Sequence, residues 1–215
     1  MKNKELIIKG LVILLIGIII GFFIGKINVP PTQNFIPENY NQDTVLRAVG
    51  NPKAKVVMVE YGDFQCPLCK VFFDDNFAKL KKDYIDTGKV YFIFKQFPLN
   101  IHPLAPGAAI ASDCALAQNK FWEYHDMLYQ KQDEWTQSQD YIGTLKQYAA
   151  DLKLDTNKFD QCLDQRTTVN QVKADYLEGV SKGITGTPTF YLNDQTIVGA
   201  QDWSVFQAKL DQLLK

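Results

Sequence analysis

Hydrophobic and polar residues follow one another along the chain in patterns that predict both strands and helices. Apolar stretches at residues 55–61 and 89–97 predict two buried strands, and the segment between them, residues 66–82, predicts a helix. A strand, a helix and a second strand in this order predict a right-handed parallel crossover. From about residue 104 to residue 181, apolar and aromatic residues recur at helical spacing with almost no strand pattern. This region is therefore predicted to be a block of several helices.

After this block the strand pattern returns. Residues 189–193 and 196–200, separated by a turn at Asn193 and Asp194, predict a hairpin, and residues 202–214 predict a closing helix. Within the helical block, breaks between helices are expected at three places: near residue 119, at residues 133–139 and at residues 151–156.

The order of these elements predicts the fold class. A β-α-β half at residues 44–103 and a β-β-α half at residues 182–215 flank the helical block at residues 104–181. We therefore predict an α/β protein with a thioredoxin fold, in which the domain with the central mixed sheet is interrupted by an inserted α-helical subdomain.

The N-terminus has a different composition from this globular part. An uncharged stretch at residues 10–25, rich in Ile, Leu and Phe, follows three lysines and is itself closely followed only by Lys26. This pattern predicts an N-terminal transmembrane signal anchor over residues 1–27. The excess of lysine before the stretch predicts a single-pass protein of the cell membrane, with a cytoplasmic N-terminus and an extracytoplasmic globular domain.

A cleaved signal peptide is the alternative to an anchor. Cleavage requires small residues ahead of the cut, but no alanine occurs before Ala48 and no A-x-A-like site follows the apolar stretch. The sequence therefore favours the uncleaved anchor.

Residues 28–43 are rich in Pro, Asn and Gln and lack an apolar period. They are predicted to form a flexible tether between the membrane and the domain. A tether of this length leaves no room for a dimerisation domain, so a monomer is expected.

Composition and charge narrow the kinds of partner. The chain is 46% hydrophobic, as in ordinary globular proteins, and its 23 Lys and Arg residues nearly balance its 24 Asp and Glu residues. It has no basic run with interleaved aromatic residues, so nothing indicates a nucleic-acid partner. Partners are expected to be recognised by shape and apolar contact.

Cys66 and Cys69 form a C-x-x-C pair at the junction of the first predicted strand and the helix after it. Pro67 suits the first helical position, where its missing N–H would have no partner in any case. Cys66 then lies at the helix N-terminus, where the partial positive charge and free N–H groups favour a thiolate. The pattern predicts a redox-active dithiol, with Cys66 as the attacking sulfur and Cys69 as the resolving one.

Half of a zinc site is the alternative for this pair, since C-x-x-C also occurs in zinc ribbons. Zinc would need two more ligands from Cys114, Cys162, His102 and His125, which form no second closely spaced pair. We therefore predict neither a metal nor another cofactor. Four cysteines in an oxidising compartment suggest two pairs.

Three sequence segments together resemble the DsbA-like branch of thioredoxin-fold thiol–disulfide oxidoreductases. They are Glu-x-x-x-x-x-Cys-Pro-x-Cys at 60–69, Cys-Ala-x-Ala-Gln-x-Lys-Phe-Trp-Glu-Tyr-His-Asp at 114–126, and Gly-Thr-Pro-Thr-Phe at 186–190. The resemblance extends from about Pro52 to the C-terminus. No single segment is specific, but the three in this order are.

The resemblance implies a cis-proline at Pro188 that faces the dithiol, preceded by Thr187, whose backbone would pair with the bound substrate. A proline at the start of a strand is also compatible with a trans bond. Together with Pro67 and Leu68, which lie between the two cysteines, Thr187 and Pro188 are the expected substrate-binding residues.

Glu60 lies six residues before Cys66 on the first predicted strand. In the family the matching acid assists proton transfer to or from the buried second cysteine, which implies a catalytic general acid/base role here. The alternative is a carboxylate at the strand end that points to solvent. Lys95 on the neighbouring strand is a candidate ion-pair partner for Glu60, although it too could lie on a solvated face.

Cys114 and Cys162 lie in the helical block. Some relatives carry a similar second pair, so the resemblance implies a structural disulfide between them. Buried free thiols are the alternative, because spacing alone does not establish connectivity. His102 and His125 are expected to be structural or surface residues.

The predicted function is that of an extracytoplasmic, membrane-anchored thiol–disulfide oxidoreductase, an oxidase that donates the Cys66–Cys69 disulfide to exported proteins. The resemblance implies reoxidation by a quinone-linked membrane partner. Leu68 departs from the strongly oxidising members, which carry histidine there, so strong oxidant character is in question. The alternatives are a reductase or isomerase of the same fold, or a non-catalytic metal-binding or chaperone module.

Overall fold

The structure, a computed structural model, describes residues 47–215. The predicted membrane anchor, residues 1–27, and the predicted tether, residues 28–43, lie outside the described residues. Within residues 47–215, no helix combines the length and the apolar character needed to cross a membrane.

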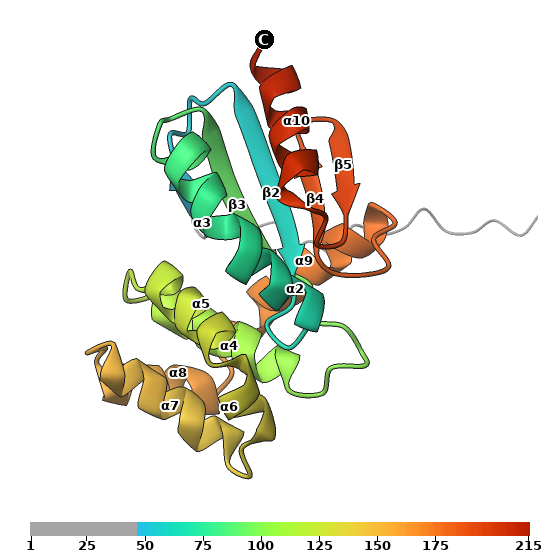
Figure 1. The fold of residues 1–215 in the computed structure, drawn as a ribbon. Coiled ribbons are helices and arrows are strands. Elements are labelled where there is room, and N and C mark those ends of the chain that lie inside the picture. The colour runs from blue at the N-terminus through green and yellow to red at the C-terminus, as the bar shows by residue number, and fades with distance from the viewer. Residues whose placement is uncertain (1–46) are drawn as a thin grey trace, which may run out of the picture. The chain divides into compact units, whose positions relative to one another are not determined.

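Five strands form the central sheet in the order β1-β3-β2-β4-β5 (Figure 1). Their bounds are β1 (Ala48–Gly50), β2 (Val56–Gly62), β3 (Val90–Gln96), β4 (Thr189–Leu192) and β5 (Gln195–Val198). β2 and β3 are parallel, whereas the other neighbouring strands are antiparallel. The predicted mixed sheet is confirmed. β1 is not predicted by the sequence, because three residues are too few to show a strand period.

Side chains alternate between the two faces of the sheet, and each face packs on different helices. On one face, Val56 and Met58 belong to a core with Phe72, Phe206 and Leu210. On the other face, Tyr61 packs with Phe97 and with Tyr176 of α9 (Val169–Ser181). Figure 1 accordingly shows α3 and α10 in front of the sheet and α9 behind it.

The helix after β2 is continuous but changes its winding. It consists of α2 (Pro67–Phe72), η2 (Phe73–Phe77), α3 (Ala78–Leu80) and η3 (Lys81–Ile85), of which η2 and η3 are π-helical. The chain ends in α10 (Trp203–Leu214). Both helices agree with the helical segments expected at residues 66–82 and 202–214.

Six helices lie between β3 and β4. They are α4 (Ala105–Leu116), α5 (Phe121–Gln130), α6 (Gln132–Gln137), α7 (Tyr141–Asp151), α8 (Thr156–Asp164) and α9 (Val169–Ser181). The breaks expected near residue 119 and at residues 151–156 are present. The break expected at residues 133–139 is wrong over residues 133–137, which belong to α6, and the chain leaves the helix only at residues 138–140. Two more breaks occur at residue 131 and at residues 165–168. A disulfide between Cys114 and Cys162 joins α4 to α8.

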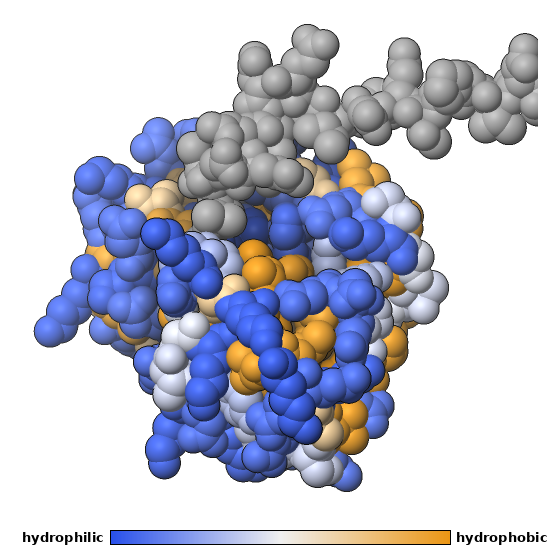
Figure 2. Space-filling view, turned by 90° about the horizontal axis from the view of Figure 1, so that it is seen from above, coloured by the Kyte–Doolittle hydropathy of each residue, from blue (hydrophilic) through white to orange (hydrophobic). Residues whose placement is uncertain are grey.

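A buried ion cluster connects the sheet to the helical insertion. Arg47, directly before β1, donates to the carboxylates of Asp113 on α4 and Asp175 on α9. All three side chains are almost completely buried. Lys95 lies 3.5 Å from Asp175 and supplies a second positive charge, so two cations face the two carboxylates. Burying these charges is tolerable because they are balanced and hydrogen-bonded. At the molecular surface, the end seen in Figure 2 is covered mainly by hydrophilic residues, with smaller hydrophobic areas between them.

Candidate active site

Cys66 is the N-cap residue of α2 and has an extended backbone, whereas Pro67 is the first helical residue. The carbonyl of Cys66 accepts the first helical hydrogen bond, from Lys70 N at 3.2 Å. Cys69 lies one turn into the helix and is fully buried, while Cys66 is 5% exposed. Both are free thiols. The structure thus places the first sulfur at the free N–H groups of a helix start and the second behind it.

The two thiols ionise very differently. The pKa of Cys66 is lowered from 9.0 to about 6, first because the Cys69 thiol donates to its sulfur and then because backbone N–H groups of Leu68 and Cys69 face it, against the opposing effect of burial. Burial raises the pKa of Cys69, and the charge of Cys66 raises it further. These shifts favour a thiolate at Cys66 and a protonated thiol at Cys69, an arrangement in which the first sulfur can act as nucleophile and leaving group.

The loop before β4 contacts the dithiol from the other side. The peptide bond between Thr187 and Pro188 is cis. The Cys66 thiol donates to the carbonyl oxygen of Thr187, at 3.3 Å. This contact joins segments 121 residues apart. It brings Thr187 next to Cys66, and the substrate-binding role of Thr187 and Pro188 stays a prediction.

Glu60 is buried, with 2% of its surface exposed. Burial raises the pKa of its carboxyl group, and the nearby charge of Cys66 raises it further. Its Oε1 atom has no hydrogen-bond partner among residues 47–215. The solvent-exposed alternative for Glu60 is therefore wrong, and a carboxyl group that holds its proton lies close to the dithiol.

The suggested ion pair between Glu60 and Lys95 is wrong. In the β2–β3 register, Glu60 lies opposite Phe94 and Lys95 lies opposite Tyr61. Since neighbouring residues of a strand point to opposite faces, the two side chains are separated by the sheet. Lys95 instead donates to Glu178 of α9 at 2.8 Å.

Pro67 and Leu68 lie on the surface beside the dithiol. Leu68 is 51% exposed, and Val71, one turn further along α2, is 41% exposed. They provide apolar surface next to Cys66, with no charge on either side chain. A substrate-binding role for Pro67 and Leu68 stays a prediction.

The turn that carries Cys66 is fixed by polar side chains that sequence reasoning missed. Asp63 accepts hydrogen bonds from Gln65 N at 2.7 Å, from Leu99 N at 2.8 Å and from His102 Nδ1 at 2.7 Å. The Asp63 carbonyl in turn accepts from Cys66 N at 3.1 Å. Asp-Phe-Gln-Cys directly before a helix is a turn sequence, so Asp63 was open to prediction as a turn residue; its pairing with His102 was not.

Two glutamines attach the same turn to the helical insertion. Gln65 Oε1 accepts from the backbone N–H groups of Leu104 and Ala105 at the start of α4. Gln132 of α6 donates to the carbonyls of Phe64 and Cys66. No sequence signal marked Gln132, because a glutamine in a short polar helix is usually exposed.

The remaining residues considered for zinc have other roles. Cys114 and Cys162 are consumed by their disulfide, and His102 pairs with Asp63. His125 is buried among aromatic rings, including Phe73, Phe94 and Tyr129, and its Nδ1 donates to the Asp126 carboxylate at 2.9 Å. Burial lowers its pKa. It is a core residue, and its ring packs on Phe64 of the turn before Cys66.

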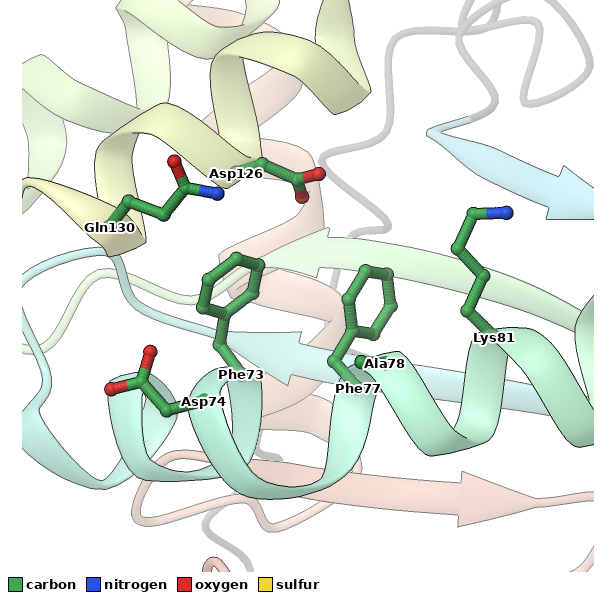
Figure 3. A pocket seen from close by; sticks show the side chains of 7 residues that line it. All are labelled: Phe73, Asp74, Phe77, Ala78, Lys81, Asp126 and Gln130. Atoms are coloured by element: carbon green, nitrogen blue, oxygen red, sulfur yellow. The ribbon is translucent and has the colours of Figure 1, made fainter.

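A groove of about 330 Å³ lies along the helix that begins at Pro67, beyond the dithiol. It is lined by Phe73, Asp74, Phe77, Ala78, Lys81, Asp126 and Gln130 (Figure 3). Figure 3 shows the rings of Phe73 and Phe77 directed from this helix toward Asp126 and Gln130 on α5. The groove contains neither cysteine, so the reactive sulfurs lie outside it.

Comparison with known proteins agrees with this geometry. A family profile described as thioredoxin matches residues 42–212. Disulfide bond formation protein D of Bacillus subtilis is 34% identical over 176 residues, which cover 78% of this chain and 76% of that protein. Other curated relatives are longer, and the chain spans about half the length of several of them.

Solved structures give the same result. Oxidised BdbD from Bacillus subtilis matches with a TM-score of 0.73 and 32% identity, over 79% of this chain and 92% of that one. α-DsbA1 from Wolbachia pipientis matches with a TM-score of 0.71 and 29% identity, over 79% of this chain and 90% of that one.

Proposed function

Because this chain belongs to the thioredoxin-fold family of DsbA-like thiol–disulfide oxidoreductases, we propose that it is an oxidase that donates the Cys66–Cys69 disulfide to exported proteins. The observation that supports this direction is the opposite displacement of the two thiol pKa values. A stabilised Cys66 thiolate favours the reduced enzyme, and an enzyme whose reduced form is stabilised is an oxidant.

The reaction begins with the oxidised enzyme. A substrate thiolate attacks Cys66, the Cys66–Cys69 bond breaks, and a mixed disulfide forms beside Pro188. Cys69 leaves as a thiolate and takes a proton, for which the buried carboxyl of Glu60 is the proposed donor. The raised pKa of each group suits this transfer, since Glu60 carries a proton to give and Cys69 retains the one it receives.

The second step releases the product. Another substrate thiolate attacks the substrate sulfur of the mixed disulfide, and Cys66 leaves as a thiolate. A pKa of about 6 makes Cys66 a good leaving group near neutral pH. The substrate has lost two electrons and two protons, and the enzyme dithiol has gained the electrons. Turnover therefore requires reoxidation, for which we propose a quinone-linked membrane partner.

The proposed location rests on the sequence of residues 1–27. An uncleaved signal anchor would hold the catalytic domain on the extracytoplasmic side of the cell membrane. Membranes washed with carbonate are expected to retain the protein. Release in soluble form with a shortened N-terminus would contradict the anchor and show cleavage.

The reduction potential tests the direction of the reaction. The Cys66–Cys69 pair of the full chain, in mild detergent, would be equilibrated with glutathione buffers and its redox state quantified by thiol alkylation. A potential near or above about −150 mV supports an oxidase, whereas one near about −270 mV indicates a reductase. Leu68, which supplies no charge to Cys66, is the feature that favours this second candidate.

A further inference from the structure

Gln132 is a polar side chain of the helical insertion that reaches the reactive turn. It is the first residue of α6 and is 5% exposed. Its Nε2 atom donates to the carbonyl oxygen of Phe64 at 2.7 Å and to that of Cys66 at 3.1 Å. The two amide hydrogens are thus committed to the carbonyls on both sides of the turn that ends at the nucleophile.

The helix that carries Gln132 is itself firmly held. Trp135, in the next turn, is fully buried, and its indole N–H donates to the carbonyl of Leu128 on α5 at 2.9 Å. The carbonyl of Gln132 accepts from Thr136 at 2.7 Å. Because α6 is fixed in this way, the Gln132 amide is pre-organised and does not adapt to the turn.

The Gln132 amide acts on the Cys66 peptide through its dipole as well as through its position. An amide NH₂ group is the positive end of a dipole, and here it points at the peptide of Cys66. The same carbonyl accepts from Lys70 N at 3.2 Å, so two donors fix the orientation of this peptide. That orientation keeps Cys66 Sγ at the start of α2 and beside the Thr187 carbonyl. Loss of the amide would leave the Cys66 carbonyl with Lys70 N as its donor and remove a positive dipole end.

We propose that Gln132 is a positioning residue for disulfide exchange, through which the helical insertion holds the Cys66 turn and favours the Cys66 thiolate. The inference deepens the proposed function, since it assigns part of the activation of Cys66 to the inserted subdomain. Gln132 touches neither sulfur in the described contacts, and it acts through the backbone of residues 64 and 66.

The test compares Gln132→Met, which keeps the size of the side chain and removes both donors, with Gln132→Glu, which keeps the size and adds a negative charge. Gln137→Met is the matched control, because Gln137 lies on the same helix and is exposed. The full chain of each variant, in mild detergent, would be titrated by the ultraviolet absorbance of the thiolate, and its reduction potential and urea stability measured.

Gln132→Met is expected to lower the acid dissociation constant of Cys66 about two- to tenfold, the range supported by loss of the one hydrogen bond to the Cys66 carbonyl. Gln132→Glu is expected to lower it further, and Gln137→Met to leave it unchanged. The reduction potential should fall in the same order. If Gln132→Met does not fold, Gln132→Asn, which keeps an amide on a side chain one CH₂ shorter, is titrated in its place, and a Cys66 titration equal to that of the unsubstituted protein overturns the proposal.

A loss of urea stability with an unchanged Cys66 titration would overturn the proposal and leave Gln132 a structural residue. These differences are measured against the unsubstituted protein, so they do not depend on the direction of the enzyme. A protein with a potential near about −270 mV would contradict the oxidase and still allow the Gln132 variants to be judged.

Discussion

Lowering the pH is expected to weaken the reduced protein more than the oxidised one. In the reduced protein the pKa of Cys66 falls from 9.0 to about 6, first through the hydrogen bond from the Cys69 thiol. A group whose pKa is lower in the folded than in the unfolded state stabilises the fold fully above the unfolded value, and this stabilisation is lost as pH falls through the folded value. The stabilisation of the reduced protein by the Cys66 thiolate is therefore lost between about pH 9 and about pH 6. In the oxidised protein Cys66 does not titrate.

The size of this stabilisation follows from the pKa of Cys66 in the unfolded and in the folded protein. The full difference between 9.0 and about 6 sets an upper bound of about 4 kcal/mol on the unfolding free energy that Cys66 contributes above pH 9, and solvent screening of this sulfur at the surface lowers it. At pH 7 only the part between pH 6 and pH 7 contributes, which is about 1 kcal/mol. For a two-electron couple, this makes the disulfide about 20 to 30 mV more oxidising than one with an unperturbed thiol.

The assay is urea unfolding of the reduced and oxidised proteins at several pH values, together with the thiolate absorbance of the reduced protein. The stability of the reduced protein relative to the oxidised one should decline from pH 9 to pH 6 and be constant below. Cys66→Ala retains Glu60 and Cys69 and serves as the control, which should lack the absorbance step near pH 6. A step near pH 9, or a stability difference that does not change with pH, would refute the reasoning.

Three further predictions concern the disulfide of the insertion, the buried Glu60 and the buried ion cluster of Arg47. Replacing both Cys114 and Cys162 by Ala should lower the unfolding free energy by about 4 kcal/mol in the chain-entropy model, for a bridge that spans 48 residues; equal urea midpoints for the variant and the parent would contradict this. Glu60→Gln should stabilise the protein above about pH 5, because burial raises the carboxyl pKa and makes ionisation costly, and should remove one step from the pH profile of exchange; an unchanged profile would exclude Glu60 from proton transfer. Arg47→Met should cost about 3–5 kcal/mol, since it leaves the buried carboxylate of Asp113 without this cation; a loss below about 1 kcal/mol in urea unfolding would show that the cluster is not stabilising.

The order of elements was predictable because its signals are local. Apolar stretches predicted β2 and β3, and a proline one residue after Cys66 predicted the start of α2, since both depend on the nearest residues along the chain. β1 was missed because its three residues pair with β3, which lies about 40 residues away in the sequence. The hydrogen bonds that define it come from that distant strand.

The candidate site also has features that local sequence predicted and features that it did not. The dithiol and its place at a helix N-terminus were visible in one sequence segment. Whether Glu60 was buried, and which face of the sheet Lys95 occupied, depended on strand register, and the register showed that the expected pair lies on opposite faces. Sequence spacing alone does not give the register.

The sequence by itself determined the kind of chemistry, because a C-x-x-C pair, the turn before it and the proline within it are fixed by neighbouring residues. The tertiary structure alone decided how reactive that pair is. Gln132 lies 66 residues from Cys66, and Thr187 lies 121 residues from it, yet both contact the same turn. Thiol pKa values depend on burial and on the groups that face each sulfur, and only the folded chain brings those groups together.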